Sequence, residues 1–168
     1  MSELFGTAPA GDGDHLVAIH DHLRGELAQL QDLVGQVARG HLDVAEARSL
    51  VATMTMRQND WTLGTYCATY CRVLTMHHTI EDVQMFPRLR DADPTLAPVV
   101  DRLEAEHHEV AAVLEDLDRA LVAMVTRPDD GVEAVRRTVD ALSVVLLAHL
   151  AYEESQLVGP LNRLSIGI

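Results

Sequence analysis

The sequence predicts an all-α protein, an up-down-up-down four-helix bundle with a short extra helix between the first and second bundle helices. Four long segments carry apolar residues at alternating spacings of three and four, which places one apolar stripe along each helix. No segment alternates with a period of two over a useful length, so no sheet is expected. The composition agrees, because 48% of the residues are hydrophobic but only 4% are aromatic, and a mixture dominated by Leu, Val and Ala suits packed helices better than strands.

The first bundle helix is predicted from a stripe that runs from Leu16 to Val37. Gly40 follows the stripe and is expected to end the helix, because glycine is common just after helix C-termini. Asp43 and Glu46 then have the spacing of a capping box, which predicts the start of the short extra helix. This extra helix is expected to end near Met56.

Three further stripes predict the other bundle helices. The second stripe starts at Leu63, and its helix runs on to about Arg90. The third helix follows Asp93-Pro94, which offers an N-cap and then proline at the first helical position. The cluster Arg127-Pro-Asp-Asp-Gly131 separates the third helix from the fourth, and Pro160 is expected to end the fourth helix.

Length and charge limit the class of protein. The 168 residues are expected to form one domain, residues 14–162, after a flexible tail of residues 1–13 that is rich in Gly, Ala and Pro. The net charge of −13 would be repelled by a phosphate backbone or an anionic membrane, so neither nucleic acid nor membrane is an expected partner. Without a signal peptide or an apolar stretch of about 18 residues, a cytoplasmic protein is expected. Cys67 and Cys71, one helical turn apart, are interpreted as reduced and buried.

One motif occurs twice. His77 stands four residues before Glu81, and His149 stands four residues before Glu153. In each copy a second acid, a Gln, two apolar residues and a proline follow. Four residues are just over one helical turn, so the imidazole and the carboxylate of each pair leave the same helix face about 6 Å apart.

Histidines and glutamates interrupt the four apolar stripes. A carboxylate in a core position is costly unless it is paired or bound to a cation. A single histidine there is more often a packed core residue, but interruptions on all four stripes favour a metal site. In an up-and-down bundle the interruptions differ in depth by roughly a turn or two, so they are expected to meet inside one end of the bundle. The predicted ligands are His20, His77, Glu81, His107, His149 and Glu153.

The donor types favour two metal ions. One zinc ion uses four ligands and would leave two costly groups unexplained, so we predict two ions bridged by the glutamates, with two histidines on each. Iron is preferred for nitrogen and oxygen donors, with manganese or zinc as possible substitutes. An oxo- or hydroxo-bridged pair leaves room for O₂, H₂O₂ or NO, and such molecules are expected to pass between Leu and Val side chains of the bundle wall. The acids that could orient the imidazoles are Asp82, Glu106 and Glu154.

Other polar residues lie close to the predicted ligands in the sequence. His78 and His108 flank the stripes, where they either support the ligands or face solvent. Tyr70 and Tyr152 are candidates for a catalytic hydrogen-bond donor or a redox relay, although packing is the simpler interpretation of both. The histidines expected at the surface are His15, His22 and His41.

The pattern resembles the hemerythrin-like (HHE cation-binding) family over residues 15–162. The stretches that carry the resemblance are IHDHLRGEL, HHTIEDVQMFP, LEAEHHEV and HLAYEESQL. Oxygen-carrying hemerythrins have a further histidine four residues after the position of His107, where this chain has Ala111, and they end with His and Asp spaced by five. The chain therefore resembles the subgroup with fewer histidines. The stretch WTLGTYCATYCRVLTMHHTIED is similar to stand-alone hemerythrin-like proteins of mycobacteria and their relatives.

For that subgroup the resemblance implies an oxo-bridged di-iron centre that acts on peroxide and nitric oxide, hence an oxidoreductase of catalase or peroxidase type. The alternative is a module that binds or senses O₂, iron or redox state without turnover, and the lack of an output domain in the sequence favours the enzyme. A ferritin-like iron oxidase would need two Glu-x-x-His motifs, whereas only Glu104 and His107 provide one. A metal-free structural bundle is the last alternative, and the oligomeric state is left open.

Overall fold

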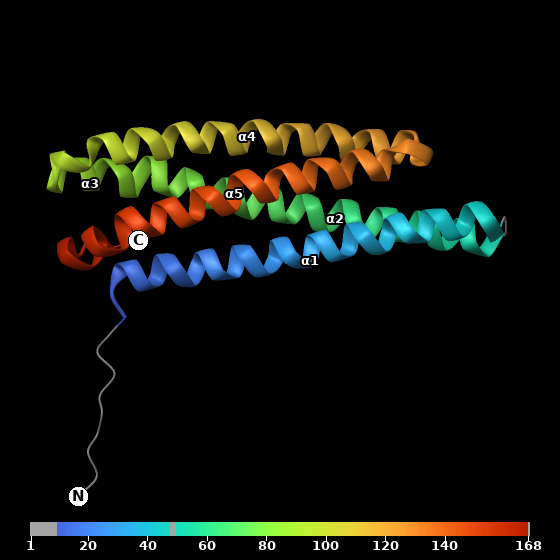
Figure 1. Ribbon diagram of the computed structural model, residues 1–168, viewed down its shortest axis with the longest axis horizontal. Coiled ribbons are helices and arrows are strands. Elements are labelled where there is room, and N and C mark those ends of the chain that lie inside the picture. The colour runs from blue at the N-terminus through green and yellow to red at the C-terminus, as the bar shows by residue number, and fades with distance from the viewer. Residues whose placement is uncertain (1–9, 48–49, 168) are drawn as a thin grey trace, which may run out of the picture.

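The computed structural model describes residues 10–47 and 50–167, with the side chains of residues 10–40, 60–127 and 131–167. Its elements are α1 (Asp12–Ala47), α2 (Leu50–Ile80), the π-helical turn η1 (Glu81–Met85), α3 (Phe86–Ala92), the 3-10 turn η2 (Pro94–Leu96), α4 (Ala97–Thr126) and α5 (Pro128–Leu164). Because α2, η1 and α3 follow one another without a break, the described residues form four antiparallel rods and contain no strand (Figure 1). The predicted all-α four-helix bundle is confirmed.

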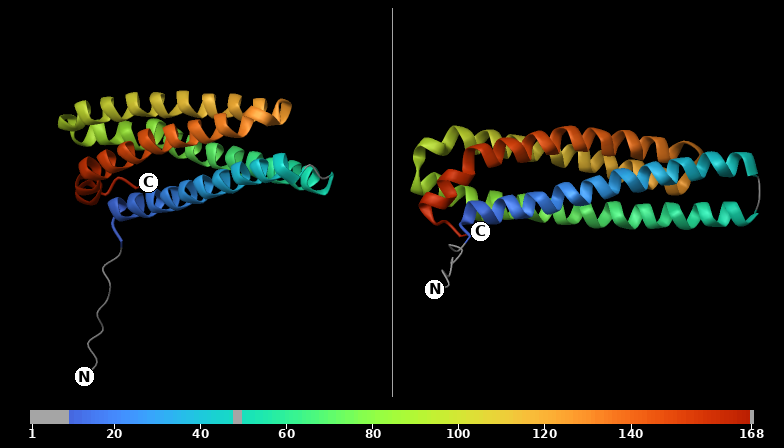
Figure 2. Two further views of the ribbon diagram at one scale, coloured as in Figure 1. Left: turned by 45° about the vertical axis from the view of Figure 1, so that its right-hand side comes forward. Right: turned by 60° about the horizontal axis from the view of Figure 1, so that its bottom comes forward.

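The rods do not pack equally closely. α5 lies against both α4 and α1, and α1 also packs on α2, whereas α2 and α4 touch less closely. The start of α1, all of α3 and the end of α5 gather at one end of the bundle, as Figure 2 shows. Among the described residues, no helix combines the length and the apolar character needed to cross a bilayer.

The prediction of a separate helix between the first two rods was wrong. α1 stays helical through Gly40 to Ala47, and α2 begins at Leu50, so residues 43–47 and 50–56 belong to these two long helices. A glycine ends a helix by taking a left-handed conformation, and none of the described glycines has a positive φ. A glycine inside a helix costs only about 1 kcal/mol relative to alanine, which a long packed helix tolerates.

The predicted end of the fourth helix was also wrong. Pro160 lies inside α5, which continues to Leu164 and stops at Ser165 with a φ of 50°. The proline removes one backbone donor. Leu157 and Leu161 are completely buried on either side of it, and their packing keeps the last turn helical.

The predicted connections around α4 are nearly right. Asp93 does act as a cap, because its side chain accepts a hydrogen bond from the backbone N–H of Thr95, but the turn it caps is η2 rather than α4. Arg127 alone separates α4 from α5. Gly131 lies so close to α4 that a Cβ added to it would be 2.2 Å from the Cα of Met124. A larger residue would therefore force the two helices apart at this turn.

Two smaller predictions concern the tail and the cysteines. Residues 1–9 of the predicted tail lie outside the described residues, and α1 already begins at Asp12. The N–H of Gly13 donates to the side-chain oxygen of Asn162 at 2.8 Å, which joins the start of α1 to the end of α5. Cys67 is buried, Cys71 is partly buried, and both are free as expected. Burial raises the pKa of the Cys67 thiol to about 12, which leaves it unreactive at neutral pH.

A polar layer divides the core into two apolar clusters. The smaller cluster fills the end of the bundle that holds α3, and the larger one extends toward the opposite end. On α4, Leu103 belongs to the smaller cluster and Val110 to the larger, with His107 between them. The same order occurs on α1, with Leu16, His20 and Leu23. The residues predicted as metal ligands lie in this layer.

Candidate metal centre

All six residues predicted as ligands lie in the polar layer, and they come from all four rods. Five of them are buried and His77 is nearly so. They fall into two groups in which the candidate donor atoms lie within 4.8 Å of one another. The first group contains His20, His77, Glu81 and Glu153, and the second contains His78, Glu81, His107 and His149. The second group thus includes a histidine that sequence reasoning left beside the site.

The carboxylate of Glu81 faces both groups. Its Oε1 lies 3.0 Å from Nε2 of His77 in the first group. Its Oε2 lies 3.3 Å from Nε2 of His107 in the second group. One carboxylate oxygen is therefore available to each group, which is the arrangement that a bridging ligand needs.

Glu153 also stands between the groups. Its Oε2 lies 3.4 Å from Nε2 of His20 and 3.6 Å from Nε2 of His149. The duplicated motif thus places both of its carboxylates between the imidazoles of different helices.

Glu81 opens the π-helical turn η1, which sequence reasoning did not predict. The N–H of Phe86 donates to the carbonyl of Glu81, five residues back, so the turn is one residue wider than an α-helical turn. Pro87 has no N–H to give to the carbonyl of Val83, which removes an α-helical bond in the same region. The wider turn keeps Glu81 and Met85 buried while Asp82 extends toward α4.

Three of the imidazoles donate a hydrogen bond from Nδ1–H to a carboxylate. The pairs are His20 with Glu154 (3.0 Å), His107 with Asp82 (2.7 Å) and His149 with Glu106 (2.9 Å). These are the three acids that the sequence suggested, so their orienting contacts are confirmed. A carboxylate only accepts hydrogen bonds, so each Nδ1 carries the proton and each Nε2 presents a lone pair to the interior.

The Nε2 atoms of His107 and His149 consequently meet with their lone pairs exposed to each other. They lie 3.1 Å apart. Two lone pairs at this distance repel each other, and a cation bound by both atoms removes the repulsion. This pair is the clearest sign that the layer is built for a positive charge.

Other buried polar atoms in the layer also lack partners. A buried polar side-chain atom without a hydrogen-bond partner costs about 1 to 3 kcal/mol. In the part of the chain that the structure describes, every such atom belongs to one of the two groups. These atoms are Nε2 of His20, His77 and His78 and both carboxylate oxygens of Glu81 and Glu153. Nitrogen and oxygen lone pairs directed at one interior region fit bound metal ions.

The electrostatics of the layer agree with that fit. Burial, together with neighbouring imidazoles, lowers the pKa of His77 and of His107 to about 3. These two imidazoles are therefore neutral, which is the form that binds metals. Burial, followed by the nearby Glu153, raises the pKa of Glu81 well above its ordinary value. A cation would relieve this cost because it stabilises the charged carboxylate.

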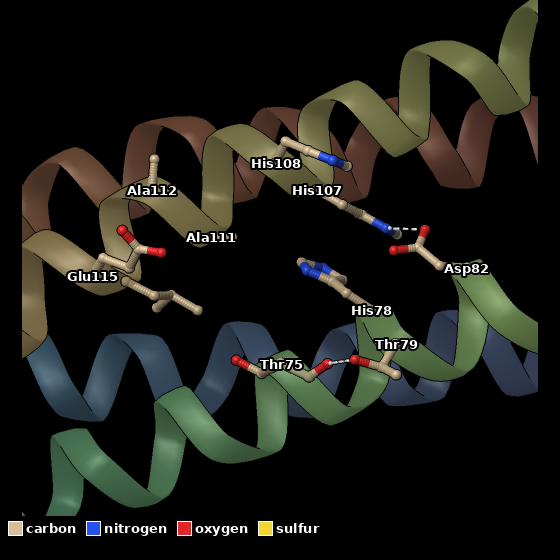
Figure 3. Close-up of a pocket in the computed structure, with 10 residues that line it drawn as sticks. Thr75, His78, Thr79, Asp82, His107, His108, Ala111, Ala112 and Glu115 are labelled. Carbon is tan, nitrogen blue, oxygen red and sulfur yellow. Dashed lines mark hydrogen bonds and ion pairs between the residues drawn. The ribbon is translucent and has the colours of Figure 1, made fainter.

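An opening between α2 and α4 leads to the second group. A cavity of about 350 Å³ is lined there by Thr75, Thr79 and Ala111, and also by His78 and His107 (Figure 3). The route was expected to run between Leu and Val side chains, but Leu114 is the one such residue in a lining that is otherwise small or polar. Small molecules have a path there to His78.

The other candidates lie outside the two groups. The Tyr70 hydroxyl donates to the carbonyl of Leu23 at 3.1 Å within the larger apolar cluster. The guanidinium carbon of Arg102 lies 3.6 Å above the ring centre of Tyr152. Neither contact involves a predicted ligand, which favours packing as the role of both tyrosines.

The remaining histidines are consistent with surface positions where they are described. His108 is exposed, and its Nδ1 donates to the carbonyl of Glu104 on the same helix at 2.8 Å. His15 and His22 are exposed as expected, and the side chain of His41 lies outside the described part of the chain.

The chain matches a known protein family. The family described as the hemerythrin HHE cation binding domain matches residues 12–161. No curated protein and no solved structure matches the chain.

Proposed function

The chain belongs to the hemerythrin HHE cation-binding family, and from this premise we propose that it is a non-haem di-iron protein that reacts with H₂O₂ and nitric oxide. The proposed ligands are the six residues predicted from the sequence. The observation that carries the proposal is the 3.1 Å separation between Nε2 of His107 and Nε2 of His149, both of which present lone pairs.

Two ions are proposed because the donor atoms form two groups that share Glu81. Donors bound at about 2.1 Å to opposite sides of one ion are about 4.2 Å apart. The spread of 4.8 Å within each group therefore requires only small movements to close around an ion. A single ion would leave part of the other group buried without a partner.

Iron is proposed because the donors are imidazoles and carboxylates. Neither Cys67 nor Cys71 belongs to either group, so ions that prefer thiolates have no advantage here. Imidazole with carboxylate suits iron and manganese, and zinc also accepts both donor types. Metal analysis of the loaded protein distinguishes the three.

The reaction with small oxidants is proposed from the family and from the access route. When bound, a pair of iron ions supplies the two-electron change that cleavage of a peroxide bond requires. The carboxylates of Asp82, Glu106 and Glu154 hold the protons on Nδ1, so the imidazole lone pairs stay directed inward. The cavity between α2 and α4 has room for molecules of a few atoms, such as H₂O₂ and NO.

The test begins with metal content. Purified chain is loaded with ferrous iron without oxygen, exposed to air, and examined by mass spectrometry of its metals and by its absorption spectrum. We expect two iron ions per chain and the near-ultraviolet bands of an oxo-bridged ferric pair. His149→Ala and Glu81→Ala should lose iron and colour, whereas His15→Ala, at an exposed position on α1, should keep both.

Activity is tested on the same samples. Addition of H₂O₂ should evolve O₂, as read with an oxygen electrode, and H₂O₂ with NO should accelerate loss of NO at an NO electrode. Less than one iron per loaded chain would favour a metal-free structural bundle. Full loading without either activity would favour a module that binds or senses O₂, iron or redox state.

A further inference from the structure

We propose that His78 is a direct metal ligand of the second group, so that one metal position is held by three imidazoles and the other by two. The inference rests on the proposed function because it requires that the chain bind metal. It changes the predicted arrangement, in which each ion received two histidines.

The first argument is the burial of a nitrogen without a partner. His78 is only 6% exposed, although it lies beside the opening between α2 and α4. Its Nε2 is buried and has no hydrogen-bond partner. One ring nitrogen of His78 lies within 4.8 Å of donor atoms from Glu81, His107 and His149.

The second argument is the ring geometry. The ring of His78 stacks on that of His107 with centroids 4.0 Å apart and an interplanar angle of 14°. It meets the ring of His149 edge-on at 5.1 Å. Stacking alone would hold the ring in place but would leave its Nε2 unsatisfied, at a cost of about 1 to 3 kcal/mol. A metal ion bound by Nε2 accounts for both the position and the missing partner.

The third argument is the place of α2 in the bundle. Adjacent helical residues point about 100° apart, so they cannot face the same neighbour. α2 lies between α1 and α4, and His77 faces α1, where its ring is 5.3 Å from that of His20. His78 faces His107 on α4. The His77-His78 pair therefore supplies one imidazole to each group, and Glu81, one turn later, reaches both.

The two metal positions would then differ in two ways. The second position has an additional imidazole, and it borders the opening to solvent through His78. His20 of the first group is completely buried. A ligand from solution can therefore take the place of the His78 imidazole more readily than that of His20.

The experiment compares His78→Ala and His78→Gln with His108→Ala. His108 is a matched control because it lines the same cavity but is exposed and has its Nδ1 hydrogen-bonded to the carbonyl of Glu104. Metal content is measured by mass spectrometry, and the affinity of each position by competition between Co(II) and a chromophoric chelator. We expect both His78 variants to retain one ion with wild-type affinity and to bind the second at least about tenfold more weakly. His108→Ala should match the wild type.

Added imidazole provides a readout that a structural role would not give. Imidazole should restore the second ion to His78→Ala, because the vacated space opens to solvent, and should leave the wild type unchanged. Thermal melts of the metal-free variants establish that they fold, and His78→Gln, which keeps most of the side-chain volume, decides the matter where His78→Ala is unstable.

The outcomes separate this inference from the proposed function. Two ions bound by folded His78→Gln with wild-type affinities would overturn the inference and leave the proposed function intact. Loss of both ions from that variant would overturn the assignment of His78 to one position. Failure of the wild type to bind metal would overturn the proposed function itself.

Discussion

Oδ1 of Asp82 lies 2.7 Å from Nδ1 of His107, so the π-helical turn after α2 holds an imidazole that belongs to α4. α2 packs less closely on α4 than on α1, so this contact helps to hold the two rods together beside the opening. Because Asp82 follows Glu81 directly, one short segment supplies both a proposed bridging ligand and the acid that orients another ligand.

We predict that Asp82→Ala lowers the iron affinity of the second position by about 10- to 100-fold, because His107 loses the partner that fixes its proton on Nδ1. Asp91→Ala, at an exposed position on α3, is the control. Competition with a ferrous chelator measures both. Equal affinities in the two variants would show that the carboxylate of Asp82 does not orient the ligand.

The stability of the metal-free protein should depend on pH through His77. Burial lowers its pKa to about 3, against a value of 6.5 in an unfolded chain. Below pH 6.5 the unfolded chain takes up a proton that the folded chain excludes. The stability that neutral His77 contributes is therefore complete above about pH 6.5 and is lost as the pH falls toward 3.

Between pH 7 and pH 5, this residue should cost the metal-free protein about 2 kcal/mol of unfolding free energy. His77→Gln cannot take up that proton, so its stability should fall by about 2 kcal/mol less over the same interval. Denaturant titrations at the two pH values give the comparison, with the exposed His15→Gln as the control. If the wild type and His77→Gln lose the same unfolding free energy between pH 7 and pH 5, protonation of His77 does not cause the loss.

A substitution in the first turn of α5 should affect stability without affecting metal binding. The Cβ of alanine at position 131 would lie 2.2 Å from the Cα of Met124, so Gly131→Ala should destabilise the protein by about 1 to 3 kcal/mol. Gly159→Ala, on α5 with no atom within 4 Å of the added Cβ, should be neutral or stabilise the protein by up to about 1 kcal/mol. Thermal melts of the two variants should differ in this order, and similar melting temperatures would argue against close packing at the turn.

A histidine introduced on α4 at position 111 should bind the second metal ion in place of His78 of α2. Ala111 lies one turn after His107 and lines the cavity together with His78. We predict that His78→Ala combined with Ala111→His regains the second metal ion. Ala112→His is the matched control, because Ala112 points away from His78 (Figure 3). Equal metal content in the two double variants would mean that position 111 does not reach the metal.

That the six proposed ligands lie together inside the bundle could be predicted from the sequence, because each of them interrupts an apolar stripe. Apolar spacing follows the helical period, so a polar residue inside the stripe must point inward, and His20 and Glu153 are in fact completely buried. His78 was not predicted as a ligand, because an apolar stripe defines only one inward direction for each helix. α2 has two such directions, one toward α1 and one toward α4.

The errors at helix ends have a different cause. Gly40 and Pro160 each make a helix locally less favourable, yet both lie inside helices. At Pro160, burial of Leu157 and Leu161 stabilises the helix by more than the proline destabilises it. The π-helical turn η1 has no recognisable pattern in the sequence, because its residues satisfy an ordinary helical stripe equally well. The direction of Asp82, Glu106 and Glu154 likewise depends on how neighbouring rods are placed around each other.

The polar layer between the two apolar clusters is where the helices of the metal-free chain should be held together least strongly. Opening there separates groups that repel one another and leaves the hydrophobic packing on either side in place. We expect backbone amides near His107 and His149 to exchange with solvent faster in the unloaded protein than in the metal-loaded protein. A metal ion bound in this layer would join the helices across it, so the loaded protein should resist unfolding better than the metal-free protein.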